Sequence, residues 1–151
     1  MSSRRRAREF ALQALFLVDQ REVTAPAAIE ALWTALLDGE GIADNARPPE
    51  SEEMEFTAGL VRGVVERRDE IDAIIELCST NWRVQRMPVV DRNVLRMAAY
   101  EIMWCPEVPP TVAINEGIEL AKLYGDKDSR AFVNGLLDRV ARRAGRIGAA
   151  T

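Results

Sequence analysis

Apolar residues recur at helical spacing along nearly the whole chain, and no stretch alternates apolar and polar residues as a half-buried strand would. The first apolar stripe follows Ser3, a residue type that caps helices, and continues as far as Val18. A second helix is expected to begin at Thr24, because a capping threonine followed closely by Pro26 is typical of a helix start. The pattern therefore predicts an all-α protein.

The middle of the chain combines a polar loop with a long apolar stripe. Two glycines, two prolines and scattered acids predict a solvated loop over residues 38–50. Ser51 then begins a stripe that reaches Cys78, and its acidic first turn suits the positive end of a helix. Charged residues over 66–70 interrupt this stripe and predict a kink or a helix break there.

Three further helices are expected in the second half, separated by prolines and glycine. Asp91 lies at the cap or in the first turn of one helix, Thr111 begins the next, Gly125 ends it, and Asp126 or Asp128 caps the last. The total is six or seven helices with short connections. Neither half of the chain has enough apolar residues for a comfortable core of its own, so the whole chain is expected to form one bundle.

Composition narrows the range of functions. The chain has 151 residues, 48% of them hydrophobic, with no histidine and two cysteines. Without histidine, histidine-based acid–base catalysis, Ser-His or Cys-His nucleophiles and most zinc sites are excluded. Cys78 and Cys105 lie in no ligand-like spacing, and no phosphate-binding glycine motif occurs. We therefore expect a protein that is not an enzyme and needs no cofactor or metal. The lack of a signal sequence and of a long apolar run predicts a soluble intracellular chain with no membrane contact.

Charge is concentrated in patches, although the net charge is only −4. Four arginines fall within five residues of the first predicted helix: Arg4, Arg5, Arg6 and Arg8. They meet the positive end of the helix dipole and repel one another, which costs about 0.3–1 kcal/mol for each exposed charge. Arginine binds phosphate through its planar fork and stacks on bases, so an RNA contact would explain the cluster. A disordered, solubilising tail would explain it equally well. Four more arginines lie near the other end of the chain: Arg139, Arg142, Arg143 and Arg146.

Other polar groups are weaker candidates for a site. The acid groups Glu52/Glu53 and Asp69/Glu70/Asp72 are expected on solvated helix faces rather than at a metal. Two asparagines, Asn115 and Asn134, interrupt apolar faces and are expected as satisfied buried amides, with ligand or RNA contact as the alternative.

Several segments match the motifs of a known family. In chain order they are Arg4-Arg5-Arg6-Ala7-Arg8-Glu9 with Ala14-Leu15-Phe16, Asp91-Arg92-Asn93-Val94-Leu95-Arg96, Ala99-Tyr100-Glu101, Val112-Ala113-Ile114-Asn115-Glu116, Ile118-Glu119-Leu120-Ala121-Lys122 and Phe132-Val133-Asn134-Gly135-Leu136-Leu137-Asp138. Together they resemble the NusB family of transcription antitermination factors. The likeness extends from about residue 3 to residue 141 and is weakest over residues 20–52.

The resemblance implies an all-α, NusB-like bundle of about seven helices in two packed three-helix subdomains. Their expected bounds are about 3–80 and 81–145 within a single RNA-binding domain over residues 1–151. It also implies a non-enzymatic role in the cytoplasm of a bacterium. The implied partners are single-stranded boxA RNA, the ribosomal protein NusE and the transcription elongation complex with other Nus factors, in support of rRNA transcription and ribosome biogenesis.

Site residues are carried over from the family by matching position. The implied RNA contacts are Arg4, Arg5, Arg6, Arg8, Asp128, Arg130 and Phe132. The implied NusE contacts are Phe16 and Asp91, with helix capping as the alternative role of Asp91. Ala131 stands where some relatives have lysine, and Ser79 stands where an aromatic residue can occur. Both departures are expected to thin the RNA surface.

Two other functions compete with this interpretation. A NusB-like module also forms part of some rRNA cytosine methyltransferases, but the 151 residues contain no cofactor-binding domain for that reaction. The chain could instead be a helical protein-interaction scaffold or homodimer without direct RNA contact, and the sequence leaves monomer and homodimer open.

Overall fold

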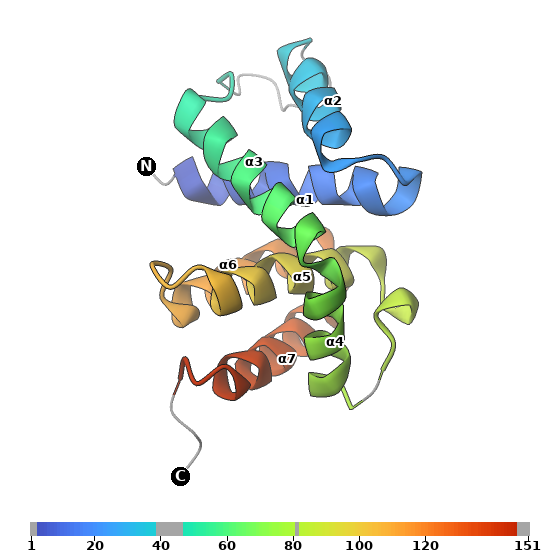
Figure 1. The fold of residues 1–151 in the computed structure, drawn as a ribbon, viewed down its shortest axis with the longest axis vertical. Helices are drawn as coiled ribbons and strands as arrows, with labels where there is room; N and C mark the ends of the chain where they lie inside the picture. Colours follow the sequence, from blue (N-terminus) through green and yellow to red (C-terminus); the bar gives the residue numbers. More distant parts are fainter. Residues whose placement is uncertain (1–2, 39–46, 81, 148–151) are drawn as a thin grey trace. The chain divides into compact units, whose positions relative to one another are not determined.

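The computed structural model describes residues 3–38, 47–80 and 82–147, and the regular elements in those ranges are all helical (Figure 1). The elements are α1 (Ser3–Arg21), α2 (Ala25–Leu37), α3 (Ser51–Glu66), α4 (Arg68–Cys78), the short 3-10 helix η1 (Val84–Arg86), α5 (Val89–Trp104), α6 (Pro110–Tyr124) and α7 (Ser129–Arg143). The all-α prediction is confirmed. None of these helices is both long and apolar enough to cross a membrane.

The helix boundaries follow local chemistry. The hydroxyl of Thr24 accepts a hydrogen bond from the Ala27 N–H at 3.2 Å, so the predicted cap of α2 is confirmed. α3 ends at Glu66 and α4 begins at Arg68, so the charged stretch predicted as a kink or break separates two helices. Most of the predicted loop over residues 38–50 lies outside the described residues.

The chain divides into two compact units, residues 1–65 (unit 1) and 66–151 (unit 2), and each is described by itself. The resemblance implies a division near residue 80, whereas contacts group α4 with α5 and α7 of unit 2. The physical reason is the apolar face of α4, on which Ile71 and Ile75 are fully buried. The break between α3 and α4 therefore coincides with the boundary between the units.

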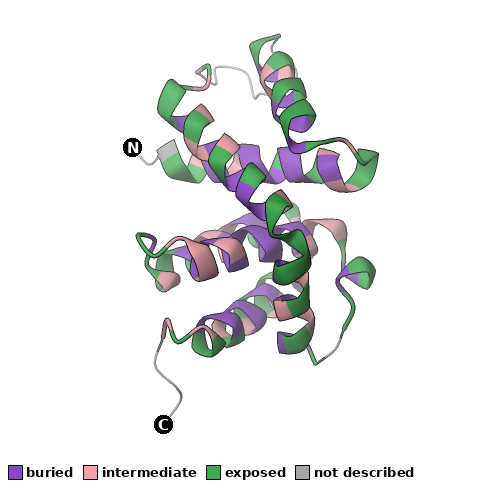
Figure 2. Ribbon diagram, in the orientation of Figure 1, coloured by how far each residue is buried: buried purple, intermediate pink, exposed green. Residues whose placement is uncertain are grey.

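The core of unit 1 forms where α1 packs against α2. Three alanines of α1, Ala7, Ala11 and Ala14, have no exposed surface and let another helix approach closely. The Phe10 ring meets the Trp33 ring edge-on, with centroids 5.6 Å apart. Figure 2 shows this buried stripe along α1.

The core of unit 2 is built on α5, which contacts both α6 and α7. Val94, Leu95 and Ile102 of α5 are fully buried. Gly117 of α6 allows α6 and α7 to approach each other closely, because an added Cβ would lie 3.0 Å from the Leu137 side chain of α7. This tight packing makes α5 the central helix of unit 2.

Arg146, three residues beyond α7, fastens the connection between α5 and α6. Its guanidinium donates hydrogen bonds to the carbonyl oxygens of Ile102, at 2.7 Å, and Val108, at 2.9 Å. Pro109 and Pro110 follow and have no N–H to offer, so the guanidinium supplies donors that the local backbone lacks. This member of the C-terminal arginine group therefore has a structural role.

Candidate nucleic-acid and partner surfaces

The four N-terminal arginines lie in the first two turns of α1 rather than in a tail, because the helix begins at Ser3. The solubilising-tail alternative is therefore wrong for these residues. Arg4 and Arg5 are exposed, Arg6 is half-buried, and only 4% of Arg8 is exposed.

Two of the arginines share an aromatic contact inside unit 1. The guanidinium carbons of Arg4 and Arg8 lie 4.6 and 5.3 Å from the centre of the Phe56 ring of α3. A cation over an aromatic face is stabilised by about 0.5–1 kcal/mol at an exposed site and more when it is desolvated. Arg8 consequently ties α1 to α3, and Arg4 lies at the edge of the same contact.

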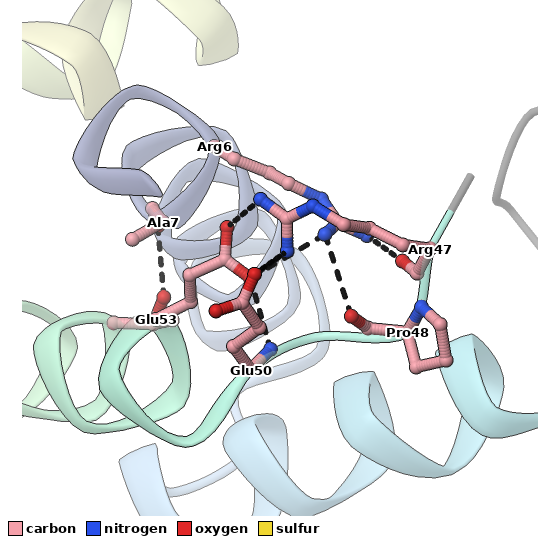
Figure 3. Close-up of polar contacts among 7 residues, drawn as sticks. Arg6, Ala7, Arg47, Pro48, Glu50 and Glu53 are labelled. Atoms are coloured by element: carbon pink, nitrogen blue, oxygen red, sulfur yellow. Dashed lines mark hydrogen bonds and ion pairs between the residues drawn. The ribbon is translucent and has the colours of Figure 1, made fainter. Parts of the chain in front are cut away.

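Arg6 reaches the chain segment that precedes α3 (Figure 3). Its guanidinium donates to the Glu53 carboxylate at 3.4 Å, to the Pro48 carbonyl at 3.5 Å and to the Arg47 carbonyl. Arg6 thereby holds residues 47 and 48 against α1. Contacts inside unit 1 therefore offset the electrostatic cost of the cluster at Arg6 and Arg8.

Glu53 is the acidic centre of this contact. Its side chain is buried, and Arg47 donates to its two carboxylate oxygens at 2.9 and 3.0 Å, as the convergence of side chains in Figure 3 shows. The Glu50 N–H donates to it at 2.9 Å. Burial alone would raise the pKa of Glu53, but the hydrogen bonds from Arg47 and Glu50 and the charges of Arg6 and Arg47 bring it below the ordinary value.

The predicted solvated face is therefore wrong for Glu53, and also for Asp72. Asp72 is half-buried in unit 2 and receives two hydrogen bonds from the buried guanidinium of Arg96, at 2.8 and 3.0 Å. Glu52, Asp69 and Glu70 are exposed as expected. Within the described ranges, no group of three or more acidic or cysteine side chains could hold a metal ion.

Phe16 is an exposed aromatic residue on the helix that bears the arginines. Its side chain is 47% exposed, while its neighbour Leu15 is buried in the stripe of α1. An exposed phenylalanine on a well-packed helix suits a protein contact, since aromatic residues are enriched at interfaces. The implied contact with NusE stays a prediction.

Asp91 is buried, although a contact with NusE would need an exposed carboxylate. It lies in the first turn of α5, only 4% exposed, and accepts a 2.6 Å hydrogen bond from the Ser129 hydroxyl of α7. Burial raises the pKa of Asp91, and Asp126 raises it further, while the Ser129 hydrogen bond opposes both. Asp91 is a first-turn acid that links α5 to α7, and its implied role as a partner contact stays a prediction.

The start of α7 presents the remaining implied RNA residues. Asp128 and Arg130 are exposed, and Phe132 is half-buried. Asp128 occupies the cap position without a capping hydrogen bond from its side chain. The Asp126 carboxylate accepts from the Asp128 N–H at 2.9 Å, and the Ser129 hydroxyl accepts from the Asp126 N–H at 3.0 Å. The predicted cap is therefore wrong for Asp128, whereas Asp126 closes the turn that leads into α7.

The asparagine prediction is also wrong, because Asn115 and Asn134 are both exposed. The buried amide is Asn93, which donates to the Val89 carbonyl at 3.0 Å and accepts from Arg96 at 3.1 Å. The two exposed asparagines are thus left to the alternative of an external contact.

The two positions that depart from the family pattern differ in their surroundings. Ala131 is exposed beside Phe132. Ser79 is buried, with its hydroxyl 3.0 Å from the Trp82 carbonyl oxygen and 3.1 Å from that of Glu76. Ser79 therefore shapes the turn after α4.

Several important residues escaped the sequence interpretation: Arg47, Glu53, Trp82 and Ser129. A signal existed for Glu53, because it shares a helical face with Thr57, Leu60 and Val64, all of which are buried. No such signal marks Ser129, whose partner Asp91 is 38 residues away in the sequence.

The implied RNA residues belong to two units. The four arginines lie in unit 1, whereas Asp128, Arg130 and Phe132 lie in unit 2. Each group contains exposed cationic side chains on a helix that also carries buried residues. Both surfaces can attract a polyanion.

Comparisons with known proteins agree along nearly the whole chain. The family model of the NusB family matches residues 5–142. The transcription antitermination protein NusB of Myxococcus xanthus is 46% identical over 93% of this chain and 96% of its own length. That of Anaeromyxobacter dehalogenans strain 2CP-1 is 48% identical over 93% of this chain and 92% of its own length.

Solved structures show the same fold. The structure of T. maritima NusB is similar with a TM-score of 0.76 and 35% identity, covering 92% of this chain and 90% of that chain. A crystal structure of the antitermination factors NusB and NusE in complex with dsRNA contains a similar chain, with a TM-score of 0.78 and 26% identity, covering 95% of this chain and 98% of that chain. The family match, the identities and the shared fold establish that this chain belongs to the NusB family of transcription antitermination proteins.

Proposed function

We propose that this chain is a non-enzymatic RNA-binding protein that acts in transcription antitermination in the cytoplasm of a bacterium. It binds boxA-type single-stranded RNA together with NusE, within an elongation complex that includes other Nus factors, and so supports rRNA transcription and ribosome biogenesis. The observation that carries this proposal is the pair of exposed arginines, Arg4 and Arg5, on a helix whose neighbouring arginines are packed inside unit 1. The similarity to a chain solved with NusE and dsRNA supports it.

The four arginines divide the work of binding. Arg4 and Arg5 project from the first turn of α1 and contact phosphates. Arg8, under the Phe56 ring, and Arg6, on Glu53, hold the helix in place and add positive potential beside the RNA. Preorganised guanidinium groups lose less conformational entropy when they bind than mobile ones.

Asp128, Arg130 and Phe132 supply the second contact, at the start of α7. An exposed arginine contacts phosphate, and a half-buried phenylalanine can stack on an unpaired base. Phe16 in unit 1 and Asp91 in unit 2 are the proposed NusE contacts. A linked pair of proteins increases the affinity for RNA beyond that of either protein alone.

The salt dependence of RNA binding tests the proposal. Each phosphate contact removed from single-stranded RNA reduces the log–log salt slope by about 0.7, so Arg4→Ala with Arg5→Ala should flatten it by about 1.4. The titration should use a labelled boxA-type RNA, with and without purified NusE. Stability should change by less than about 1 kcal/mol, because the loss of the Phe56 contact and the relief at the helix dipole oppose each other.

Arg21→Ala is the matched control, since Arg21 is exposed at the other end of α1 and should leave the slope unchanged. An unaltered slope for the Arg4/Arg5 variant, in the presence of NusE, would contradict the RNA contact. Size-exclusion chromatography with and without the RNA then separates the remaining alternative, a scaffold or homodimer that binds only proteins.

A further inference from the structure

Trp82 is an aromatic side chain that the function above leaves unused. Of the three tryptophans, Trp33 and Trp104 are half-buried, whereas Trp82 is 40% exposed. Its ring meets the Phe132 ring edge-on in unit 2, with centroids 5.1 Å apart and planes at 64°. A large ring is thus presented to solvent beside a residue already implicated in RNA binding.

The backbone around Trp82 is fastened on both sides. The buried Ser79 hydroxyl lies 3.0 Å from the Trp82 carbonyl oxygen, and Thr80 between them adopts a left-handed conformation with φ of 57°. Two residues beyond Trp82, the Val84 N–H donates to the Glu76 carboxylate at 2.9 Å. Residues of α4 and of the turn after it therefore anchor Trp82, which lies outside the helices.

Phe132 is fixed independently from the other side of the contact. Its N–H donates to the Asp128 carbonyl at 3.2 Å in the first turn of α7. The first turn of α7 is itself attached to α5 through the hydrogen bond from the Ser129 hydroxyl to the Asp91 carboxylate. The two rings meet as parts of separately anchored segments, so their relative orientation is preorganised.

Charged residues lie close to both aromatic residues in the sequence. Arg83 follows Trp82 and Arg130 lies two residues before Phe132, and both are exposed. The exposed carboxylate of Asp128 is a hydrogen-bond acceptor for a base amino group or a ribose hydroxyl. Cations for phosphate, an acceptor for polar edges and an aromatic face for the base are the combination found in single-strand binding sites.

We propose that Trp82 and Phe132 form an aromatic platform on which one unpaired base of the RNA stacks, with Trp82 supplying the exposed face. This inference rests on the proposed RNA-binding function and adds a base-stacking residue to it. Phe132 positions the Trp82 ring and closes one side, while Arg83 and Arg130 draw the backbone of the strand toward the platform.

Binding of a labelled single-stranded RNA of about 12 nucleotides tests the platform, at about 50 mM salt and with the intact protein. Stacking of one base on an aromatic side chain corresponds to about a 5- to 150-fold change in affinity. Trp82→Leu, which keeps an apolar group on Phe132, should weaken binding within that range. Trp82→Phe should weaken it less, and Leu77→Ala, at an exposed apolar residue of α4, should have no effect.

A set of RNAs with one abasic position each distinguishes stacking from a structural role. At the position that stacks, removal of the base should abolish the difference between wild type and Trp82→Leu, while other positions retain it. If every abasic RNA retains the full difference, Trp82 affects binding through folding alone, and the platform is ruled out.

Fluorescence supplies a second readout. In a protein with Trp33→Phe and Trp104→Phe, the emission of Trp82 should be quenched as the RNA saturates the protein. A protein that retains only Trp104 should show no quenching. Saturable RNA binding without quenching of Trp82 would overturn the platform while leaving the proposed function intact. Failure of the wild-type protein to bind RNA, alone or with NusE, would overturn both.

Discussion

Glu53 in unit 1 and Asp91 in unit 2 are deeply buried carboxylates whose pKa values are shifted in opposite directions. Glu53 in unit 1 faces two guanidinium groups and a backbone N–H, which hold its pKa below the ordinary value. Asp91 in unit 2 receives a hydroxyl hydrogen bond from Ser129 and lies near the like charge of Asp126, and burial raises its pKa. Similar burial thus leaves one carboxylate charged and stabilised and the other carrying a desolvation penalty.

The difference shows why burial alone does not identify the role of an acid. The Glu53 charge is neutralised by arginines that would otherwise repel one another beside the proposed RNA surface. The Asp91 carboxylate has a neutral partner and secures one helix to another. The contributions of Glu53 and Asp91 to the free energy of unfolding should therefore depend on pH with opposite signs.

The largest effect is expected from Glu53→Gln. Breaking a fully buried ion pair costs about 3–5 kcal/mol, and the 36% exposure of the Arg47 side chain reduces the expected loss here to about 2–3 kcal/mol. The free energy of unfolding, measured in urea at neutral pH, checks this. Glu52→Gln changes an exposed acid of the same turn and should cost no more than about 1 kcal/mol.

The pH dependence of that difference sharpens the comparison. Because the folded-state pKa of Glu53 is lowered, its charge stabilises the protein at pH values above its ordinary pKa. This contribution is lost as pH falls through the folded-state pKa. The gap between wild type and Glu53→Gln should narrow below about pH 4.5. If the difference in the free energy of unfolding between wild type and Glu53→Gln stays constant as the pH falls, the charge on Glu53 does not stabilise the protein.

Ser129→Ala should have an intermediate effect. It removes the hydroxyl that donates to Asp91 and accepts from the Asp126 N–H, and leaves a buried carboxylate without that donor. We expect a loss of about 1–2 kcal/mol in the free energy of unfolding. Asp128→Asn, in the same turn but without a capping hydrogen bond, should stay within about 0.5 kcal/mol of wild type. Equal losses in the two variants would remove the proposed importance of the Ser129 contact.

The smallest effect at neutral pH is expected from Asp91→Asn, because the amide oxygen still accepts from Ser129 and the buried charge disappears. Stability should lie within about 1 kcal/mol of wild type at pH 7. A raised folded-state pKa means that wild type binds a proton more readily when folded, so it should gain stability relative to the variant as pH falls. If wild type instead loses stability relative to Asp91→Asn as pH falls, as is predicted for Glu53, the contrast between the two carboxylates is wrong.

Elements with periodic sequence were predictable, whereas contacts between distant polar residues were not. Helical spacing of apolar residues identified the helices, and the charged stretch over 66–70 identified the break after α3. Arg8 directly follows the buried Ala7, but its burial depends on Phe56, which lies 48 positions further along the chain. A single sequence does not show which distant partner neutralises a charge.

The candidate surfaces show the same limit. Exposure of Arg4, Arg5 and Phe16 follows from their positions around α1 and agrees with the sequence interpretation. Exposure of Asn115 and Asn134 does not, because polar residues at the edge of an apolar stripe can point either way. Trp82 went unnoticed because it lies outside the helices, where no periodicity reports on burial.

The hydrogen bonds that Arg146 donates to the connection between α5 and α6 form late in synthesis of the chain. Ribosomes add about 5–20 residues per second, so the roughly 80 residues from the end of unit 1 to Arg146 take about 4–16 s to make. During that interval the carbonyl oxygens of Ile102 and Val108 are synthesised before their donor exists. Unit 1 is therefore complete for several seconds before the corner between α5 and α6 can be locked.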